Sequence, residues 1–135
     1  MTFTIGIDVG GTKVLGGVVD ANGKVLTTSR RDTPREGGEA LTKAIAEVAL
    51  ELAGQYEVSA VGLSAAGFVS SDRKTMLATP NIAGWNGVQL DAVLTEMIKL
   101  PVVLENDANA AAWGEKTFGA GKGKANMLMV TVGTG

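Results

Sequence analysis

Five residues near the start of the chain combine the groups that a phosphate-binding turn needs. They are Asp8, Gly10, Gly11, Thr12 and Lys13. Glycines let backbone N–H groups approach an anion, Thr and Lys side chains can donate to its oxygens, and Asp8 can hold magnesium directly or through water. The run also fits a plain Gly-Gly hairpin with a solvated Asp and Lys, and spacing alone does not separate the two. It matches neither a Walker loop nor a dinucleotide fingerprint.

A second polar pair, Asn106 and Asp107, lies between a short apolar run and an alanine-rich one. Ligand sites in open α/β sheets gather where a strand leads into a helix. Asp107 could act there as a general base toward a substrate hydroxyl, and Asn106 could bind a neighbouring hydroxyl as donor and acceptor, which suits a sugar. Either residue could instead be the helix N-cap. A cap at the positive helix end would also keep Asp107 ionised, so the two interpretations are compatible.

A third candidate is the polar, glycine-containing loop that begins at Thr79 and carries Asn81 and Trp85. Thr79 and Asn81 offer hydrogen bonds of the kind that hold a carbohydrate, and an aromatic ring can wall such a pocket. A single Trp in a loop is more often a packing anchor than a ligand contact. We therefore expect Trp85 to be structural and the loop around it to be functional.

The hydrophobic pattern predicts the elements that must position these residues. Apolar runs predict strands over residues 3–8, 14–19, 24–33, 58–64 and 102–104, with a short strand over 75–78. Helical spacing predicts helices over 41–52, 90–98 and 108–118. A glycine- and lysine-rich hinge at 119–124 precedes a last predicted strand over 127–132. The expected fold is α/β, a mixed five-stranded sheet with helices on its faces, plus a stray C-terminal strand.

The composition excludes several classes of protein. Of the 135 residues, 45% are hydrophobic and 19% charged, which is typical of one folded domain. A net charge of −2 leaves no basic stripe for nucleic acid. The absence of Cys and His removes disulfides and the usual zinc ligands, while a hard, oxygen-bound cation stays open. Without a basic leader or a long apolar segment, we expect no membrane association and a cytoplasmic location.

Taken in order, these segments resemble the ROK family of bacterial sugar kinases and sugar-responsive repressors, within the actin and hexokinase superfamily. Residues 5–13 are similar to its first phosphate loop, 62–67 to its sugar-side turn, 79–85 to its sugar loop, 105–109 to its catalytic segment and 130–135 to the start of its second phosphate loop. The resemblance implies a ribonuclease H-like, actin-type ATPase domain. Residues 1–118 would be its N-terminal lobe, and 119–135 the hinge and first strand of a truncated C-terminal lobe.

The resemblance also implies a role for each motif residue. Asp107 is the expected base for the sugar 6-hydroxyl, and the expected sugar contacts are Asn106, Gly67, Thr79 and Asn81. The residues expected to face ATP are Asp8, Gly10, Gly11, Thr12, Lys13, Gly133 and Thr134, with Asp8 also the magnesium ligand. The implied reaction is the glucokinase step of glycolysis, ATP-dependent phosphorylation of glucose at its 6-hydroxyl. Such a transfer depends mostly on alignment and charge neutralisation, and the base is secondary.

Several alternatives stay open beside glucokinase. The sugar could be N-acetylmannosamine, fructose or another hexose, and polyphosphate could replace ATP. The chain could be a fragment of a sugar-sensing repressor, but we expect no preceding DNA-binding domain, because the first strand is predicted to start at Phe3. It could also be a non-catalytic assembly fragment.

The resemblance places other parts of the family's active site beyond residue 135. These are a Glu, a Glu-x-x-His segment and a cysteine-rich structural zinc site. We therefore expect the chain by itself to be inactive. We also expect a homo-oligomer, formed by strand exchange through residues 127–132.

Overall fold

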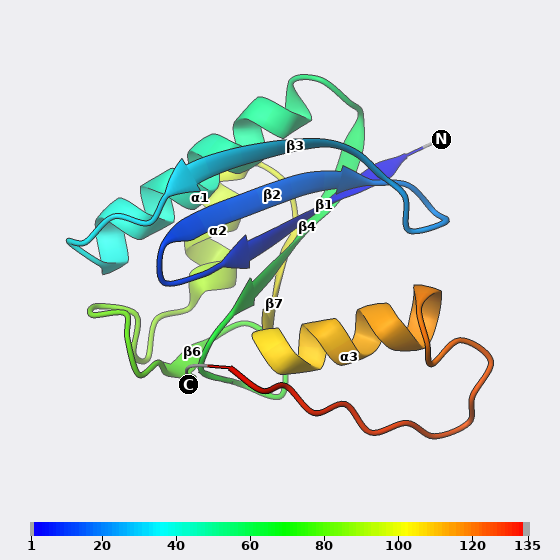
Figure 1. Cartoon of the computed structure of the whole chain (residues 1–135). Helices are drawn as coiled ribbons and strands as arrows, with labels where there is room; N and C mark the ends of the chain where they lie inside the picture. The colour runs from blue at the N-terminus through cyan, green and yellow to red at the C-terminus, as the bar shows by residue number, and fades with distance from the viewer. Residues whose placement is uncertain (1, 134–135) are drawn as a thin grey trace.

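The computed structural model describes residues 2–133, and a five-stranded mixed sheet lies at its centre (Figure 1). The strands are β1 (Phe3–Val9), β2 (Lys13–Val19), β3 (Val25–Asp32), β4 (Val58–Ala65) and β7 (Val102–Asn106). Their order across the sheet is β3-β2-β1-β4-β7. β2 is antiparallel to β1 and β3, whereas β1, β4 and β7 are parallel. The carboxyl ends of β1, β4 and β7 therefore lie at one edge of the sheet.

The helices of the described residues are α1 (Gly38–Ala53), α2 (Leu90–Ile98) and α3 (Asp107–Phe118). α1 and α2 lie together on one face of the sheet (Figure 1), where α1 packs on β1, β2 and β3 and α2 packs on β7. α3 starts at the end of β7 and lies toward the opposite face, where Ala110 lines a cleft with Gly6 and Ser64. Within residues 2–133, no helix has the length and apolar character needed to cross a bilayer.

The hydrophobic core fills the space between the sheet and the two helices α1 and α2. Successive side chains of a strand point to opposite faces, so every second residue of β1 is buried, starting at Ile5. α1 contributes apolar side chains at helical spacing, namely Leu41, Ile45, Val48 and Leu52. These elements confirm the predicted mixed sheet and its helices, with bounds that differ by a few residues.

A small hairpin of β5 (Phe68–Val69) and β6 (Met76–Ala78) follows β4. The sequence predicted β6 but missed β5, because two residues are too few to show a period. The hairpin turn is closed by Ser70, whose hydroxyl donates to the Asp72 carboxylate and holds the pKa of Asp72 below its usual value. The turn also contacts the sheet, since the Leu104 N–H donates to the Arg73 carbonyl at 3.1 Å.

The prediction of a strand over residues 127–132 is wrong, because these residues form no strand in the described part of the chain. The segment is part of no strand there, and Leu128, Val130 and Val132 are 88%, 72% and 94% exposed. Apolar residues suggested a strand, but a strand forms only where a neighbour can pair with its backbone groups. Figure 1 shows that the segment instead runs back along α3 toward β6. Strand exchange through this segment stays a prediction.

The packing of α1 on the sheet should make Gly16 of β2 sensitive to added volume. A Cβ at Gly16 would lie 2.5 Å from Val48 Cγ1 and 3.0 Å from Leu52 Cδ1. Replacing Gly16 by Ala should therefore overpack the core and lower the free energy of unfolding by about 1–3 kcal/mol. Urea unfolding followed by circular dichroism measures this change.

The matched control is Gly6→Ala on β1. Gly6 is exposed, and a Cβ built on it meets nothing within 4 Å. The free energy of unfolding should stay the same or rise by about 0.5–1 kcal/mol, because Gly weakens a strand relative to Ala. Equal losses in the two variants would contradict a core confined to the α1 face.

Candidate active site

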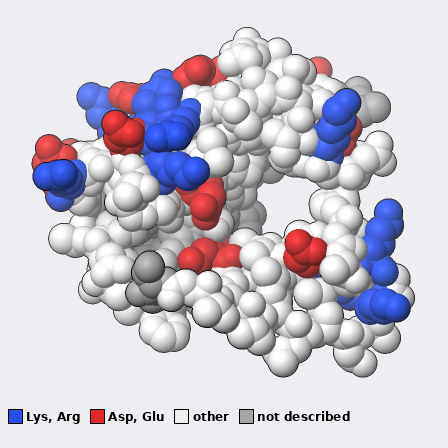
Figure 2. All heavy atoms as spheres, viewed as in Figure 1, with Lys and Arg blue, Asp and Glu red and all other residues white. Residues whose placement is uncertain are grey.

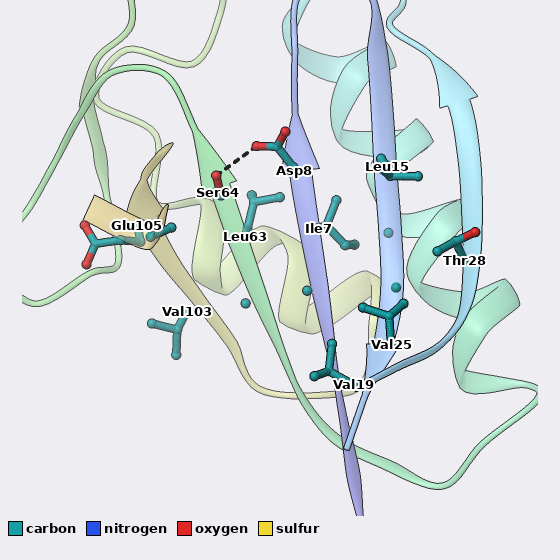
Figure 3. A pocket seen from close by; sticks show the side chains of 15 residues that line it. Ile7, Asp8, Leu15, Val19, Val25, Thr28, Leu63, Ser64, Val103 and Glu105 are labelled. Atoms are coloured by element: carbon teal, nitrogen blue, oxygen red, sulfur yellow. Dashed lines mark hydrogen bonds between the residues drawn. The ribbon is translucent and has the colours of Figure 1, made fainter. Parts of the chain in front are cut away.

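The three parallel strands bring three polar side chains into one row at the edge of the sheet. Asp8 is paired in register with Ser64, and Ser64 with Glu105. Each is the last residue but one of its strand, so the turns that follow the strands meet at the same edge. The Ser64 hydroxyl donates to Asp8 Oδ1 at 2.9 Å, as the dashed line in Figure 3 shows. This bond fixes one oxygen of the Asp8 carboxylate.

A cleft of about 420 Å³ opens at this edge. Asp8 and Ser64 line it from the sheet, and Asp107 lines it from the start of α3. The rest of its lining consists of Ala108, Ala110, Ala111 and Thr131. In the space-filling view, Asp and Glu side chains lie beside the hollow in the middle of the molecule (Figure 2). Two carboxylates separated by small side chains leave room for a polar ligand.

The predicted phosphate turn is the tight connection between β1 and β2. The Gly10 N–H donates to the Lys13 carbonyl at 2.9 Å, and the Thr33 hydroxyl donates to the Gly10 carbonyl at 2.8 Å. Gly11, Thr12 and Lys13 are exposed. The hairpin interpretation is therefore confirmed, and it leaves a hydroxyl and an ammonium group accessible close to Asp8. Their contact with phosphate stays a prediction.

Asn106 is the N-cap of α3. Its Oδ1 accepts hydrogen bonds from the backbone N–H groups of Ala108 at 3.0 Å and Asn109 at 3.1 Å. Its Nδ2 donates to the Gly67 carbonyl at 2.8 Å. The amide therefore has one N–H left for a ligand. The cap hypothesis is confirmed, while the sugar contact of Asn106 stays a prediction.

Gly67 occupies a position that only glycine fits. Its φ is +144°, and a Cβ would lie 2.5 Å from the Ala78 carbonyl oxygen. Because its carbonyl binds the Asn106 amide, the turn after β4 fixes the start of α3. Gly67 thus acts through its backbone in this structure, and its contact with the sugar stays a prediction.

The loop that starts at Thr79 lines a second cleft, of about 310 Å³, together with the phosphate turn. Gly10 and Gly11 contribute to this cleft, and so do Thr79 and Asn81. The Thr79 N–H donates to Asn86 Oδ1 at 2.9 Å, which holds the backbone. The Thr79 hydroxyl is buried and has no hydrogen-bond partner in the described structure. Buried polar atoms are nearly always paired, so this hydroxyl is an unusual unpaired group beside the cleft.

Trp85 anchors the same loop on α1. Its side chain is 1% exposed, and its Nε1 donates to the Gly38 carbonyl at 3.2 Å and to the Thr42 hydroxyl at 3.1 Å. The Gly38 N–H in turn donates to the Ala83 carbonyl at 2.7 Å. The ring does not line the cleft of Thr79, so the predicted structural role of Trp85 is confirmed.

Asp8 could supply one protein ligand to a magnesium ion at this edge of the sheet. No three Asp or Glu residues within 2–133 form a closed metal site. Magnesium in phosphoryl-transfer sites is usually held by one or two carboxylates together with phosphate oxygens and water, so a closed site is not required. Asp8 is exposed at the cleft, with one oxygen bound to Ser64. This donor set fits an ion held mainly by the phosphates of a nucleotide.

The structure adds three residues to which the motifs had given no role, Ser64, Arg73 and Glu105. Arg73 Nε lies 3.2 Å from Glu105 Oε2. Ser64 and Glu105 could have been suspected because they end apolar strands, as Asp8 does. Arg73 lies in the hairpin turn between Gly67 and Thr79, and no local pattern marks it.

Two of the residues predicted to face ATP, Gly133 and Thr134, lie at the C-terminal end of the chain. Gly133 is exposed in the segment that follows Thr131, which lines the cleft of Asp8. Thr134 lies outside the described residues.

The sequence matches the ROK family over residues 4–135. The chain belongs to the ROK family. Over 135 residues it is 47% identical to the glucokinase of Streptomyces coelicolor, and the match covers 100% of this chain and 42% of that protein. This ROK chain therefore spans less than half the length of the curated relative.

Solved structures of ROK proteins show the same fold. The ROK family glucokinase from Streptomyces griseus, in complex with glucose and AMPPNP, matches with a TM-score of 0.84 and 46% identity over 90% of this chain and 38% of that one. The inorganic polyphosphate/ATP-glucomannokinase from Arthrobacter sp. strain KM matches with a TM-score of 0.83 and 35% identity over 92% and 51%. The predicted actin-type ATPase fold is thereby confirmed.

Replacing Asn106 by Ala in this ROK chain should loosen α3. Loss of an N-cap costs about 0.5–2 kcal/mol, and α3 has no buried residue of its own to offset it. We expect faster amide exchange throughout α3, measured by NMR. Asn106→Ser is the control, because Ser keeps a cap acceptor but cannot donate an amide to Gly67. Unchanged exchange in the Ala variant would contradict the importance of the cap.

Proposed function

We propose that this chain is the N-terminal lobe of a longer ROK sugar kinase. Residues 1–118 would form the lobe, and residues 119–135 would form the hinge and the start of a C-terminal lobe. The match covers 42% of the Streptomyces coelicolor glucokinase, which supports a longer parent protein. The glycine- and lysine-rich stretch after α3 supports a hinge there. Such a kinase would work in the cytoplasm, where ATP is available.

We further propose that the complete protein transfers the terminal phosphoryl group of ATP to the 6-hydroxyl of glucose. The observation that carries this proposal is the cleft that Asp8 and Asp107 both line. Asp8 lies near the carboxyl end of β1, just before the predicted phosphate turn, and Asp107 begins α3, so a phosphate and a hydroxyl could meet between them. The glucokinases among the relatives, one of them with bound glucose and AMPPNP, support the choice of sugar and nucleotide.

In this proposal Asp107 takes the proton of the 6-hydroxyl as its oxygen attacks phosphorus. Asp107 lies in the first turn of α3, directly after the N-cap residue Asn106. The sugar would be oriented by the free N–H of Asn106 and by Thr79 and Asn81. Alignment of these groups supplies most of the rate enhancement in phosphoryl transfer.

The phosphates would lie against the turn of residues 10–13. The backbone of Gly10 and Gly11 permits close approach, and Thr12 and Lys13 offer a hydroxyl and an ammonium group. Asp8 would hold magnesium, which supplies neutralisation of the phosphate charge when bound. Asp8 lines the cleft of Asp107, and Val9, Gly10 and Gly11, which follow it in the chain, line the cleft of Thr79.

Replacing Asp107 by Asn in the complete kinase should lower kcat by a factor of about 10²–10⁴, because the base is lost. The KM for glucose should change little, since the amide keeps its size and polarity. A coupled assay with glucose and ATP measures both. Glu57→Gln is the control, an exposed carboxylate next to the amino end of β4, and should keep full activity. Wild-type kcat in the Asp107 variant would refute the base assignment.

Replacing Thr79 by Val should separate sugar binding from stability. If the hydroxyl contacts glucose, its loss should raise the Kd about tenfold. The free energy of unfolding should not fall, because the lost hydroxyl has no partner in the protein. Calorimetric titration with glucose and urea unfolding of the complete kinase test the two parts.

Thr42→Val is the matched control for this variant. The Thr42 hydroxyl donates to the Gly38 carbonyl at 2.8 Å and accepts from Trp85, and it does not line the cleft of Thr79. This change should lower the free energy of unfolding by about 1–3 kcal/mol and leave the Kd for glucose unchanged. Equal glucose affinity in the Thr79 variant and wild type would remove Thr79 from the sugar site.

A further inference from the structure

The Glu105 carboxylate joins a hairpin turn to the candidate catalytic segment. Its Oε2 faces Arg73 Nε at 3.2 Å. Its Oε1 accepts the backbone N–H of Asn106 at 2.9 Å and the side-chain amide of Asn109 at 3.3 Å. One carboxylate thus holds residues on both sides of Asp107. None of the roles proposed above uses this arrangement.

Arg73 has a backbone conformation that is unusual for its side chain. Its φ is +60°, in the left-handed region that glycine and asparagine enter more easily. The turn holds it there, since the Arg73 N–H donates to the Ser70 carbonyl at 2.8 Å and its carbonyl accepts the Leu104 N–H at 3.1 Å. An unfavourable conformation at a large residue points to a use for the side chain. Within residues 2–133, the Arg73 side chain forms an ion pair with Glu105.

The Arg73–Glu105 pair is less exposed than an ordinary surface ion pair. The Glu105 side chain is 19% exposed and that of Arg73 is 47%, against 82% and 70% for Glu96 and Lys99. Figure 3 shows Glu105 at the carboxyl end of β7, in the row that contains Ser64 and Asp8. Partial burial reduces screening by solvent, and the additional hydrogen bonds fix the carboxylate in one orientation.

We propose that Arg73 and Glu105 are positioning residues for phosphoryl transfer. Arg73 fixes the Glu105 carboxylate, and Glu105 fixes the backbone at Asn106 and therefore the direction of Asp107. This inference rests on the proposed kinase function. Neither residue touches the reacting atoms. Since a misplacement of about 1 Å can lower turnover by about 10²-fold, a small shift of this segment is enough to matter.

Arg73→Gly in the complete kinase tests the proposal. Glycine suits the φ of this position, so the variant should fold with an unchanged or higher Tm while it loses the contact to Glu105. We expect kcat to fall about tenfold or more, with the KM for ATP within about twofold of wild type. Arg73→Lys, which keeps the positive charge, should recover part of the lost kcat.

Lys99→Gly is the matched control. Lys99 is the other non-glycine residue with positive φ within 2–133, at +62°, and it pairs with Glu96 at 2.7 Å just after α2. Its replacement makes the same backbone change and removes an ion pair, but lies apart from both clefts. It should leave kcat unchanged.

Amide hydrogen exchange at Asn106 gives a readout that does not depend on activity. The exchange rate should rise about tenfold in Arg73→Gly and stay unchanged in Lys99→Gly, because the Asn106 N–H is held by Glu105. An unchanged kcat in Arg73→Gly would overturn the proposal, and so would a lower kcat with unchanged exchange at Asn106. Wild-type protein without glucokinase activity would instead overturn the proposed function. Exchange alone would then decide whether Arg73 holds the segment.

Discussion

The parallel pairing of β1, β4 and β7 is the constraint on which the site depends. Parallel neighbours end at the same edge of a sheet, so Asp8, Ser64 and Glu105 stand in one row although they are distant in sequence. Parallel strands also need long crossover connections, which here contain α1 and α2. Both helices cover the same face, and the hydrophobic core forms beneath them. The cleft between Asp8 and Asp107 is therefore lined by the carboxyl ends of the strands and by the start of α3.

The turns at this edge hold one another in place. The Gly67 carbonyl binds the amide of Asn106, the Thr33 hydroxyl binds the Gly10 carbonyl, and Trp85 ties the neighbouring loop to α1. The groups in these hydrogen bonds stabilise the turns and are therefore not free to bind a ligand. The described structure leaves Asp8, Thr12, Lys13 and Asp107 exposed, and the Thr79 hydroxyl is buried there without a partner.

Family membership and local geometry support the proposed function in different ways. Similarity to ROK proteins identifies the fold and the order of the motifs. The geometry shows which residues face a common space and which stabilise the backbone instead. Asn106 illustrates the difference, because the same side chain caps α3, binds Gly67 and keeps one N–H for a ligand. A single residue can therefore support the fold and still offer a donor, and the Arg73–Glu105 pair adds contacts to residues on both sides of Asp107.

Much of the architecture follows from the sequence by itself. The alternation in β1, the helical spacing from Leu41 to Leu52 and the adjacent glycines after Asp8 reflect backbone preferences that act over a few residues. Only the tertiary structure decided the contacts between residues that are distant in sequence. Among residues 2–133 it left the Thr79 hydroxyl unpaired, joined Arg73 to Glu105 and paired residues 127–132 with no strand. Local patterns specify which conformation a segment prefers, whereas hydrogen bonds and ion pairs between segments exist only once the sheet has brought them together.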